Sequence, residues 1–454
     1  MGSTRYASVL GLGFGDCGKG HFVDALARRL EAHSVVRFNG GAQAGHNVVT
    51  PAGVDSTGRH HTFSQFCAGT FVPGVCTVLV DPMVVHPTAL LVEAQALGRV
   101  GVHDALSRLK IDGQCRITTP YHQAAGRLRE RLRGEAAHGT CGVGVGETVR
   151  HAIGHPDQAL RYGELLCSTS TGAVHLKQKL ESIRQTLLAE FSPLCPSGSN
   201  GAESVEFQTL RDETIAEKWA TGSRALARQC PPESTKAISS QLNRPGCILF
   251  EGAQGVLLDE WRGFHPYTTW SSITTAAVNN VASRFGIRSP IEHYGVLRSY
   301  LTRHGIGPFP TYDESLDRQL PEPHNNHDGW QGVFRRGHPD SVLLRYALEA
   351  AGELSGLLIG HLDIFERGVS LKWCDRYATP APPQFSPTVK RLPLSSGEDL
   401  SHQSMLTSLL ACVRPEYDVK PICSARGLLD RIASVTGLPI VLRSFGATWN
   451  DVLE

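Results

Sequence analysis

The segment GLGFGDCGKGHFVDAL at residues 11–26 is the feature that most constrains how this chain can fold. It follows a short apolar run at residues 7–10, which predicts a strand, and its second half has the apolar spacing of a helix that begins near Gly20. The loop between them has the Gly-x4-Gly-Lys spacing of a phosphate-binding loop, ending in Gly18 and Lys19. A second apolar run, SVVRF, follows the helix. Strand, loop, helix and strand in this order form the usual frame for phosphate binding in a largely parallel sheet.

The loop departs from the standard phosphate-binding sequence at two points. A standard loop continues with Ser or Thr, whose hydroxyl helps to hold Mg²⁺, whereas this one continues with Gly20. An acid, Asp16, also lies inside the loop. The glycines allow backbone N–H groups to approach phosphate oxygens at the positive end of the helix, and Lys19 can neutralise phosphate charge. The alternative interpretation is a glycine-rich tight turn that carries a solvated lysine.

The composition is that of an ordinary globular protein. The chain has 454 residues, of which 41% are hydrophobic and 19% charged, and its formal net charge is +1. This balance gives no electrostatic reason to expect nucleic acid or a membrane as a partner, and no apolar stretch approaches the ~18 residues of a membrane-spanning helix. The cysteines form no CxxC pair, which argues against a zinc or redox motif and favours a reducing, cytoplasmic setting.

Strand and helix patterns alternate along the chain and predict one α/β domain over residues 1–454, with a large, mostly parallel central sheet flanked by helices. Two segments rich in Pro, Gly or Ser, at 192–204 and 375–400, are expected to be irregular excursions. Further strands are predicted at 76–85, 247–255, 291–303, 356–365 and 438–446, and helices at 87–98, 121–134, 340–352 and 425–437.

Four further motifs place polar residues after predicted strands. The glycine-rich run NGGAQAGHN contains His46, whose imidazole can face a phosphate, although a lone histidine is more often structural. FEGAQG ends a strand with Gln254, and ligands of α/β proteins bind at such strand ends. The third motif is LTRHGIGPFPT at residues 301–311. GHLDIF places Asp363 after a strand, where a carboxylate can accept both N–H groups of a guanine edge.

The segment PYTT lies between FEGAQG and LTRHGIGPFPT. Taken in this order, the phosphate loop and these motifs resemble the adenylosuccinate synthetase family over nearly the whole chain. FEGAQG, PYTT and TRHGIGPFPT are highly specific to that family. The resemblance implies a P-loop-like, GTP-binding α/β fold and a cytoplasmic homodimer that works with Mg²⁺. It also implies a GTP-dependent C–N ligase, which phosphorylates the 6-oxygen of IMP or an IMP-like purine nucleotide before an amine, aspartate in the family, displaces the phosphate.

The same resemblance assigns roles to individual residues. Asp16 corresponds to the base that removes the purine N1 proton, and it also binds Mg²⁺ together with the carbonyl of Gly45. His46 corresponds to the acid at the transferring phosphate, and Lys19 and Gln254 complete the catalytic set. The implied GTP contacts are Gly15, Gly18, Lys19, Gly20, Gly45, His46, Asp363, Ser444 and Gly446. The implied contacts to the nucleotide substrate are Asp16, Thr140, Cys141, Gln254 and Thr269. Either Arg161 or Arg150 corresponds to the arginine that crosses the dimer interface to the substrate site of the partner.

The sequence departs from the family at the phosphate donor's site. Cys17 and His21 replace a Glu and a Lys of the loop, and Gly360 and His361 replace the Thr and Lys that precede Asp363. The aliphatic wall over the guanine is thereby lost. GTP is still the expected donor, but the choice among triphosphates is less constrained than in the family.

The largest departure concerns the amine donor. Val143 stands in place of one arginine that binds aspartate in the family, and three small or apolar residues at 332–334 stand in place of three others. A charge-assisted pair with a carboxylate contributes roughly 1.5–3 kcal/mol, so losing two or more weakens aspartate binding by several powers of ten. The sequence therefore predicts a less charged donor pocket, built from Val143, Trp330, Val333, Phe334, Arg335 and Arg336.

Three functions stay open at this point. The first is a ligase of this family, either with aspartate or as a paralogue of specialised nucleoside metabolism with another amine donor or acceptor. The second is a nucleotide-binding protein without ligase activity, which the joint retention of Asp16, Lys19, His46 and Gln254 argues against. The third is a kinase that phosphorylates without amination.

Overall fold

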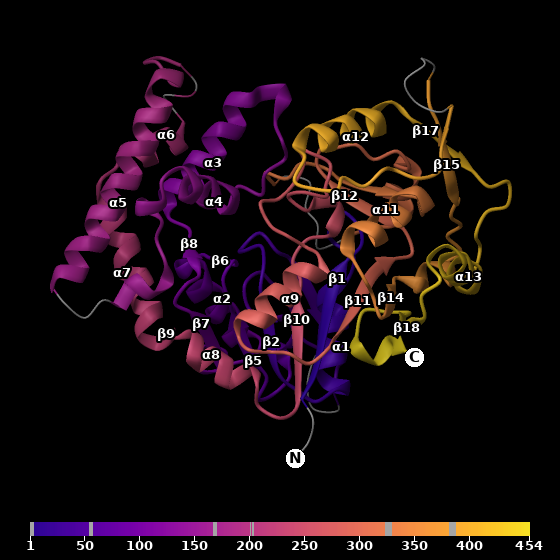
Figure 1. Ribbon diagram of the computed structural model, residues 1–454, viewed down its shortest axis with the longest axis horizontal. Coiled ribbons are helices and arrows are strands. Elements are labelled where there is room, and N and C mark those ends of the chain that lie inside the picture. Colours follow the sequence, from indigo (N-terminus) through magenta and orange to yellow (C-terminus); the bar gives the residue numbers. More distant parts are fainter. Residues whose placement is uncertain are drawn as a thin grey trace.

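The computed structural model describes residues 4–53, 58–166, 170–199, 201, 204–322, 329–380 and 387–454. Its centre is a ten-stranded sheet in the order β19-β18-β14-β11-β1-β10-β2-β5-β7-β9, in which β18 and β19 are the antiparallel pair among the described strands (Figure 1). The predicted mostly parallel sheet is confirmed. Its strands are β1 (Arg5–Gly11), β2 (Ala32–Arg37), β5 (Cys76–Leu79), β7 (Leu109–Asp112), β9 (Pro232–Glu233), β10 (Cys247–Glu251), β11 (Ile291–Arg298), β14 (Gly356–Gly360), β18 (Ile440–Ser444) and β19 (Val452–Leu453).

The central strands are covered on both faces, which is why they are near-continuous apolar runs. Phe22 and Val23 of the first helix, for example, join Val9 and Val35 of the sheet in one buried cluster. Figure 1 shows α3–α7 on the side of the molecule where β7 and β9 lie, and α11–α13 on the side of β14 and β18. The helices are α1 (Lys19–Arg29), α2 (Pro87–Arg99), α3 (Pro120–Arg133), α4 (Val145–Gly154), α5 (Ser170–Phe191), α6 (Val205–Arg211), α7 (Thr214–Gln229), α8 (Thr235–Leu242), α9 (Thr275–Arg284), α10 (Glu314–Gln319), α11 (Ser341–Ala351), α12 (Leu400–Cys412) and α13 (Ala425–Thr436).

The four later helices predicted from the sequence are confirmed as α2, α3, α11 and α13. Each begins at a residue whose side chain accepts a hydrogen bond from a backbone N–H of the first turn. These capping residues are His86, Thr119, Asp340 and Ser424. Such caps satisfy N–H groups that have no partner inside the helix, which explains why the helices begin where they do.

The strand predicted at 291–303 is wrong as a single element. It divides into β11, which ends at Arg298, and β12 (Leu301–His304), which leaves the main sheet and pairs antiparallel with β13 (Phe334–Gly337). Local periodicity continues across the break and carries no information about which strand is the partner. In the same way, 76–85 divides into β5 and β6 (Val84–Val85), and 356–365 ends its strand at Gly360.

The two predicted excursions are only partly described. Most of the described part of 375–400 is irregular, but its start belongs to β15 (Cys374–Ala378), which pairs with β16 (Thr388–Val389) and β17 (Arg414–Tyr417). Residues 381–386 of this segment lie outside the described residues, as do 200, 202 and 203 of the segment 192–204.

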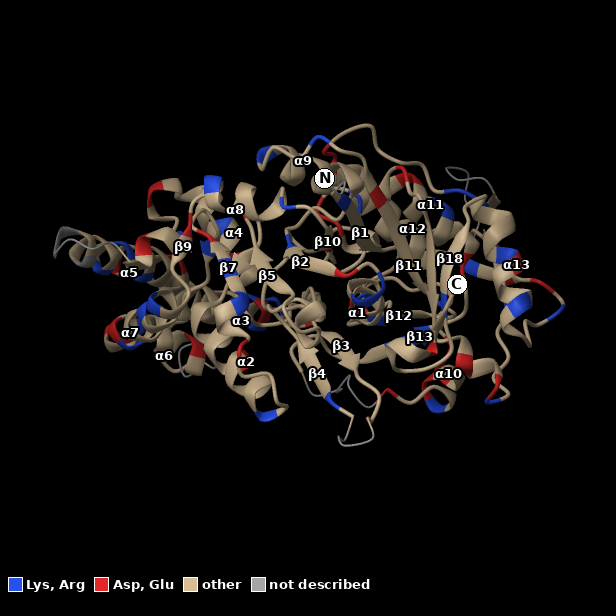
Figure 2. Cartoon of the chain, turned by 90° about the horizontal axis from the view of Figure 1, so that it is seen from below, with Lys and Arg blue, Asp and Glu red and all other residues tan. Residues whose placement is uncertain are grey.

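Basic and acidic residues are interspersed along the outer helices (Figure 2). Within the described ranges, no helix is both long and apolar enough to cross a bilayer. The cysteines that the structure describes are free thiols, and Cys167 lies outside the described residues.

The phosphate loop after β1 packs directly on the chain that leaves β10. The backbone N–H of Leu257 donates to the carbonyl of Gly13 at 3.2 Å. A Cβ at Gly255 would lie 2.2 Å from that same carbonyl oxygen, a distance that Cβ atoms do not reach in proteins. Position 255 therefore requires glycine, and it couples the end of β10 to the conformation of the loop.

We expect Gly255→Ala to lower the free energy of unfolding by about 1–3 kcal/mol, because the added methyl group has to displace the loop. The matched control is Gly146→Ala in α4, where a Cβ meets no heavy atom within 4 Å and the change favours the helix. Chemical denaturation measures both variants, and titration with a non-hydrolysable nucleoside triphosphate should show weaker binding in Gly255→Ala alone. Equal stability and binding in the two variants would contradict this account.

Candidate active site

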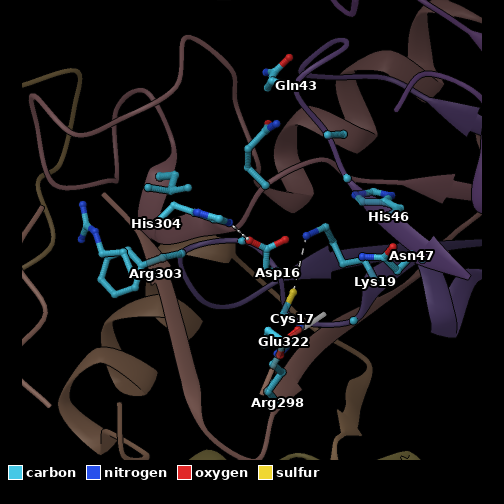
Figure 3. Close-up of a pocket in the computed structure, with 18 of the residues that line it drawn as sticks. Asp16, Cys17, Lys19, Gln43, His46, Asn47, Arg298, Arg303, His304 and Glu322 are labelled. Atoms are coloured by element: carbon cyan, nitrogen blue, oxygen red, sulfur yellow. Dashed lines mark hydrogen bonds and ion pairs between the residues drawn. The ribbon is translucent and has the colours of Figure 1, made fainter. Parts of the chain in front are cut away.

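A cavity of about 420 Å³ lies where β1, β10, β11 and β14 end. This carboxyl edge of a parallel sheet is the usual place for ligands in α/β folds. Figure 3 shows side chains from both glycine-rich loops and from β11 and β12 around it. The predicted site residues that line it are Gly15, Asp16, Gly18, Lys19, Gly20, Gly45, His46, Cys141, Gln254, Thr269, Ser444 and Gly446.

Asp16 lies in the phosphate loop with a φ of 40°, a left-handed conformation that Asp tolerates better than most residues. Its Oδ2 is 3.2 Å from Nε2 of His304 (Figure 3). Burial raises the pKa of the Asp16 carboxyl. The hydrogen bond from His304 and the charges of Arg298 and Lys19 outweigh burial, however, and hold the pKa below its usual value. Asp16 is therefore ionised at neutral pH.

Lys19 is the first residue of α1 and is almost fully buried. Gly18 before it has a φ of 89°, which places the loop N–H groups and the helix start on the cavity. Within the described residues, the Nζ of Lys19 has no carboxylate at ion-pair distance, and its hydrogen bond goes to Sγ of Cys17 at 3.6 Å. A buried ammonium at the positive end of a helix, without an acidic partner, favours a bound anion such as phosphate.

His46 begins β3 (His46–Val49) and bonds through Nδ1 to Oε1 of Glu251, the last residue of β10. The other oxygen of Glu251 accepts the backbone N–H of Ala68 at 3.0 Å. Burial lowers the pKa of His46 to about 4, against the opposing effect of Glu251. Burial raises the pKa of Glu251, but His46 and Arg37 outweigh it and lower that pKa. The pair is thus a carboxylate and a neutral imidazole whose Nε2 is left for a ligand.

Two buried amides in the cavity lack partners. Both amide atoms of Gln43, and Oε1 of Gln254, are buried without a hydrogen bond in the described part of the chain. Gln254 also has a φ of 57°, which only a few side chains adopt. Buried polar groups are normally paired, so these amides indicate a polar ligand at this position.

The far end of the cavity, predicted to hold the base of the triphosphate, is lined by histidines. Nε2 of His21 bonds to Oγ of Ser444 at 2.8 Å, and burial lowers the pKa of His21 to about 4. His361 lines the cavity with a φ of 60°. Asp363 lies just beyond the lining and pairs with Arg367 at 3.2 Å, both side chains being partly exposed.

Two arginines of the lining were not singled out in the sequence. Arg298 forms an ion pair with Glu322, which also lines the cavity. Arg303 is buried, donates to the carbonyl of Pro308 at 2.8 Å and lies over the ring of Phe14. Burial lowers the pKa of Arg303 to about 9. Figure 3 shows its guanidinium directed away from Asp16.

The loop predicted to hold the substrate phosphate reaches the cavity through Cys141. Nε2 of Gln331 donates to Sγ of Cys141 at 2.8 Å, and both residues line the cavity. Thr140 lies beside Cys141 but outside the lining, and its backbone N–H donates to Glu130 at 3.1 Å.

Neither candidate for the interface arginine reaches the cavity of its own chain. Arg150 is held by two carboxylates, Glu147 and Glu190, at 2.6 and 2.7 Å. Arg161 donates to the carbonyl of Gln114 at 2.6 Å and has a 41% exposed side chain. Arg150 therefore has closer carboxylate partners in its own chain than Arg161 has.

The residues predicted for the amine-donor pocket lie behind the lining rather than in it. Phe334 is fully buried, and its ring centroid is 4.7 Å from that of His304. Arg335 donates to the carbonyl of Gly307 at 2.6 Å, and Arg336 is buried and pairs with Asp317 at 3.3 Å. Arg336 is therefore paired with an acid of its own chain, whereas Arg335 has no carboxylate at ion-pair distance among the described residues but lies outside the cavity lining.

The other three residues predicted for the amine-donor pocket, Val143, Trp330 and Val333, also lie outside the cavity lining. Val143 packs against a small cluster of valines. The guanidinium groups of Arg127 and Arg131 lie 5.5 and 5.3 Å from the ring centroid of Trp330. Val333 is about half exposed.

The cavity has oxygen ligands of the kind that Mg²⁺ prefers. The carboxylate of Asp16 and the backbone of Gly45 both line it. Among the described residues there is no cluster of three or more His, Cys, Asp or Glu suited to a metal. One carboxylate, a carbonyl and the phosphates of a substrate form a typical Mg²⁺ environment, so the residues present fit this ion.

Sequence reasoning missed His304, although it quoted the motif that contains it. The only sequence feature that pointed to this residue was the histidine beside Arg303 in TRHG. The local pattern did not indicate that this segment turns toward Asp16. Glu251 was noted at a strand end, but its pairing with His46 depends on strands that are distant in sequence. Arg298, Glu322 and Gln331 gave no signal.

Comparison with known proteins gives a consistent answer. Residues 8–452 match the sequence model of the family described as adenylosuccinate synthetase. The structure resembles fully ligated adenylosuccinate synthetase from Plasmodium falciparum, with 20% identity, a TM-score of 0.76 and coverage of 99% of each chain. It also resembles succinoaminodeoxyadenylate synthetase (PurZ) of cyanophage S-2L, bound to dGMP and to dATP as an energy donor, with 17% identity, a TM-score of 0.60 and coverage of 100% of this chain and 96% of the other.

At these identities the two solved structures establish the fold, while the family match extends over nearly the whole chain. Members of this family are ligases that form C–N bonds and bind purine nucleotides. The chain belongs to the adenylosuccinate synthetase family.

Proposed function

We propose that this chain is a GTP-dependent C–N ligase that phosphorylates the 6-oxygen of IMP or an IMP-like purine nucleotide, after which an amine displaces the phosphate. The observation that supports this most strongly is the convergence of Asp16, Lys19 and His46 on one cavity (Figure 3), with Glu251 bonded to His46 from behind the lining. They supply a base, a phosphate-binding ammonium and an oriented imidazole, which are the groups that the first step needs.

The first step begins at the purine. A purine carbonyl oxygen is a poor nucleophile, but removal of the N1 proton by Asp16 makes the 6-oxygen an oxyanion. The oxyanion attacks the γ-phosphorus, the bond from this phosphorus to the β–γ bridging oxygen breaks, and GDP leaves. Asp16 is ionised, so it can accept the proton.

The phosphoryl group is held by charges that are in place before it arrives. Lys19 and the N–H groups of the loop offset the negative charge of the phosphates. A phosphate beside His46 raises the pKa of the imidazole, because an opposite charge favours the protonated form, and Glu251 keeps the ring oriented. Mg²⁺, held by Asp16 and Gly45, supplies Lewis-acid stabilisation of the phosphate charge when bound.

In the second step an amine attacks C6 and the phosphate leaves. We infer that this amine is not aspartate, because the lining does not offer an unpaired arginine for each of its two carboxylates. Arg335 and Arg336 lie outside the lining, Arg298 is paired with Glu322, and Val143 stands where the family has an arginine. Arg303 lines the cavity without an acidic partner among the described residues, but one guanidinium does not bind both carboxylates. A paralogue with another donor, working in specialised nucleoside metabolism, accounts for these changes.

A kinase that stops after the first step uses the same activating residues. The mass of the nucleotide product separates the two functions, since a ligase product carries the amine and a kinase product keeps the phosphate. A protein that only binds nucleotides gives neither product.

We expect Asp16→Asn to slow phosphoryl transfer by at least about 100-fold, because the general base is lost. Positional isotope exchange within ¹⁸O-labelled GTP, with IMP and Mg²⁺ present and no amine, measures this step alone. Binding of a GTP analogue, measured by calorimetry as the control, should change by no more than about threefold. Unimpaired exchange in Asp16→Asn would contradict the assigned role.

The donor inference predicts the outcome of an amine panel. With GTP and IMP, we expect aspartate to give a kcat/KM at least about 100-fold below that of the best monocarboxylic or uncharged amine, because at least two charge-assisted contacts are lost. Phosphate release, together with product mass, measures each amine. Efficient and selective use of aspartate would refute the inference while leaving the ligase function intact.

The triphosphate preference tests the proposed guanine contact at Asp363. A carboxylate that accepts two N–H groups discriminates between bases by about 1–3 kcal/mol, so Asp363→Asn should reduce the GTP-to-ATP preference in kcat/KM roughly 10- to 100-fold. Arg367→Ala removes the competing ion pair and should raise kcat/KM for GTP by less than about fivefold, since exposed pairs contribute little. A wild-type preference for ATP or dATP would show that GTP is not the donor.

A further inference from the structure

We propose that His304 is a positioning residue for Asp16, and that it holds the carboxylate in the orientation needed to take the purine proton. This inference rests on the proposed function of Asp16 as a base. It concerns a residue outside the set that the sequence motifs assigned, and it starts from the contact drawn in Figure 3.

The strand β12 presents two side chains to Asp16. Thr302 and His304 are two residues apart, so they lie on one face of the strand, whereas Arg303 between them lies on the other. The hydroxyl of Thr302 donates to the backbone carbonyl of Asp16 at 3.5 Å, and Nε2 of His304 lies 3.2 Å from its Oδ2. One face of β12 thus contacts both the backbone and the side chain of Asp16.

The imidazole of His304 is held by Phe334. The two residues are direct cross-strand partners in the antiparallel pair of β12 and β13, and their rings are 4.7 Å apart with an interplanar angle of 54°. Phe334 is fully buried and cannot move aside easily. Cross-strand packing of this kind restricts the ring of His304 to the orientation in which Nε2 meets Asp16.

The contact with Asp16 accounts for the presence of a polar imidazole at position 304. The other ring nitrogen, Nδ1, is buried and has no hydrogen-bond partner among the described residues. A histidine kept for the stability of the fold would be expected to bond through both nitrogens, or to be replaced by an apolar residue. The unpartnered Nδ1 therefore indicates that the imidazole is kept for its contact with Asp16.

The contact divides the two oxygens of Asp16 between two tasks. Oδ2 accepts the hydrogen bond from His304 and keeps a lone pair that could bind Mg²⁺, which leaves Oδ1 for the purine N1 proton. The described residues offer Oδ2 no other hydrogen-bond donor, so without this bond the orientation of the carboxylate is less restricted. A base must lie within hydrogen-bond reach of the proton that it removes, so loss of orientation lowers the rate rather than the affinity.

The test compares His304→Leu with His304→Gln, whose amide N–H can still donate to Asp16. Both are measured by positional isotope exchange in labelled GTP with IMP, without an amine, which gives a maximal exchange rate and an apparent KM for IMP. We expect His304→Leu to lower the maximal rate about 10- to 100-fold with KM changed less than about threefold, and His304→Gln to recover at least about tenfold of that loss. His103→Leu, an exposed histidine remote from the cavity, is the matched control and should leave both values unchanged.

The outcomes separate this inference from the proposed function. If the wild type shows exchange and His304→Leu has an unchanged maximal rate, with or without a raised KM for IMP, the positioning role is overturned and the proposed function is not. An equal loss in His304→Gln and His304→Leu, at equal thermal stability, would also overturn it. Absence of exchange in the wild type with IMP and other 6-oxopurine nucleotides would overturn the proposed function itself. If His304→Leu fails to fold, His304→Asn, which is polar but too short to reach Asp16, takes its place.

Discussion

The negative charge of Asp16 is the constraint on which the arrangement of this site depends. A carboxylate in a partly buried cavity that must also receive phosphates is unfavourable unless cations surround it. Lys19 and Arg298 provide that charge and His304 provides a hydrogen bond, and together they keep the pKa of Asp16 low despite burial. Arg298 is in turn fixed by Glu322. The electrostatic environment is thus built into the protein before substrates bind, which is what efficient stabilisation of transition-state charge requires.

The strand order explains how these groups meet. β1 lies between β10 and β11, so the loop after β1 has the end of β10 on one side and the end of β11 on the other. This order brings Glu251 to His46, 205 positions away in sequence, and Arg298 to Asp16. The close approach of Gly255 to Gly13 fixes how far the loop stands from β10. The cavity is therefore a consequence of parallel strands that end at one edge.

Local sequence singled out residues that lie in recognisable loops. The spacing of glycines around Lys19 predicted a phosphate loop, and the resemblance to the family, rather than the local pattern, suggested the roles of Asp16, His46 and Gln254; the structure places all four on one cavity. His304 was not predicted, because its role depends on β12 leaving the main sheet and on its register with β13. A periodic pattern shows that a segment is a strand, but not which strand it pairs with. The polar contacts of the site depend mostly on such pairings.

Positions 304 and 334 are coupled through that register. Phe334 stands where the family resemblance places an arginine, and it is the residue against which the imidazole of His304 packs. An arginine at position 334 would place a cation against the imidazole of His304 in a buried setting, whereas the phenyl ring lets the imidazole lie against Asp16. The phenyl ring at position 334 and the Asp16–His304 contact thus belong to one packing arrangement. Under the proposed function, a dicarboxylate amine would meet the charge of Asp16 with fewer carboxylate-binding arginines than the family resemblance provides, so repulsion as well as lost attraction would disfavour aspartate.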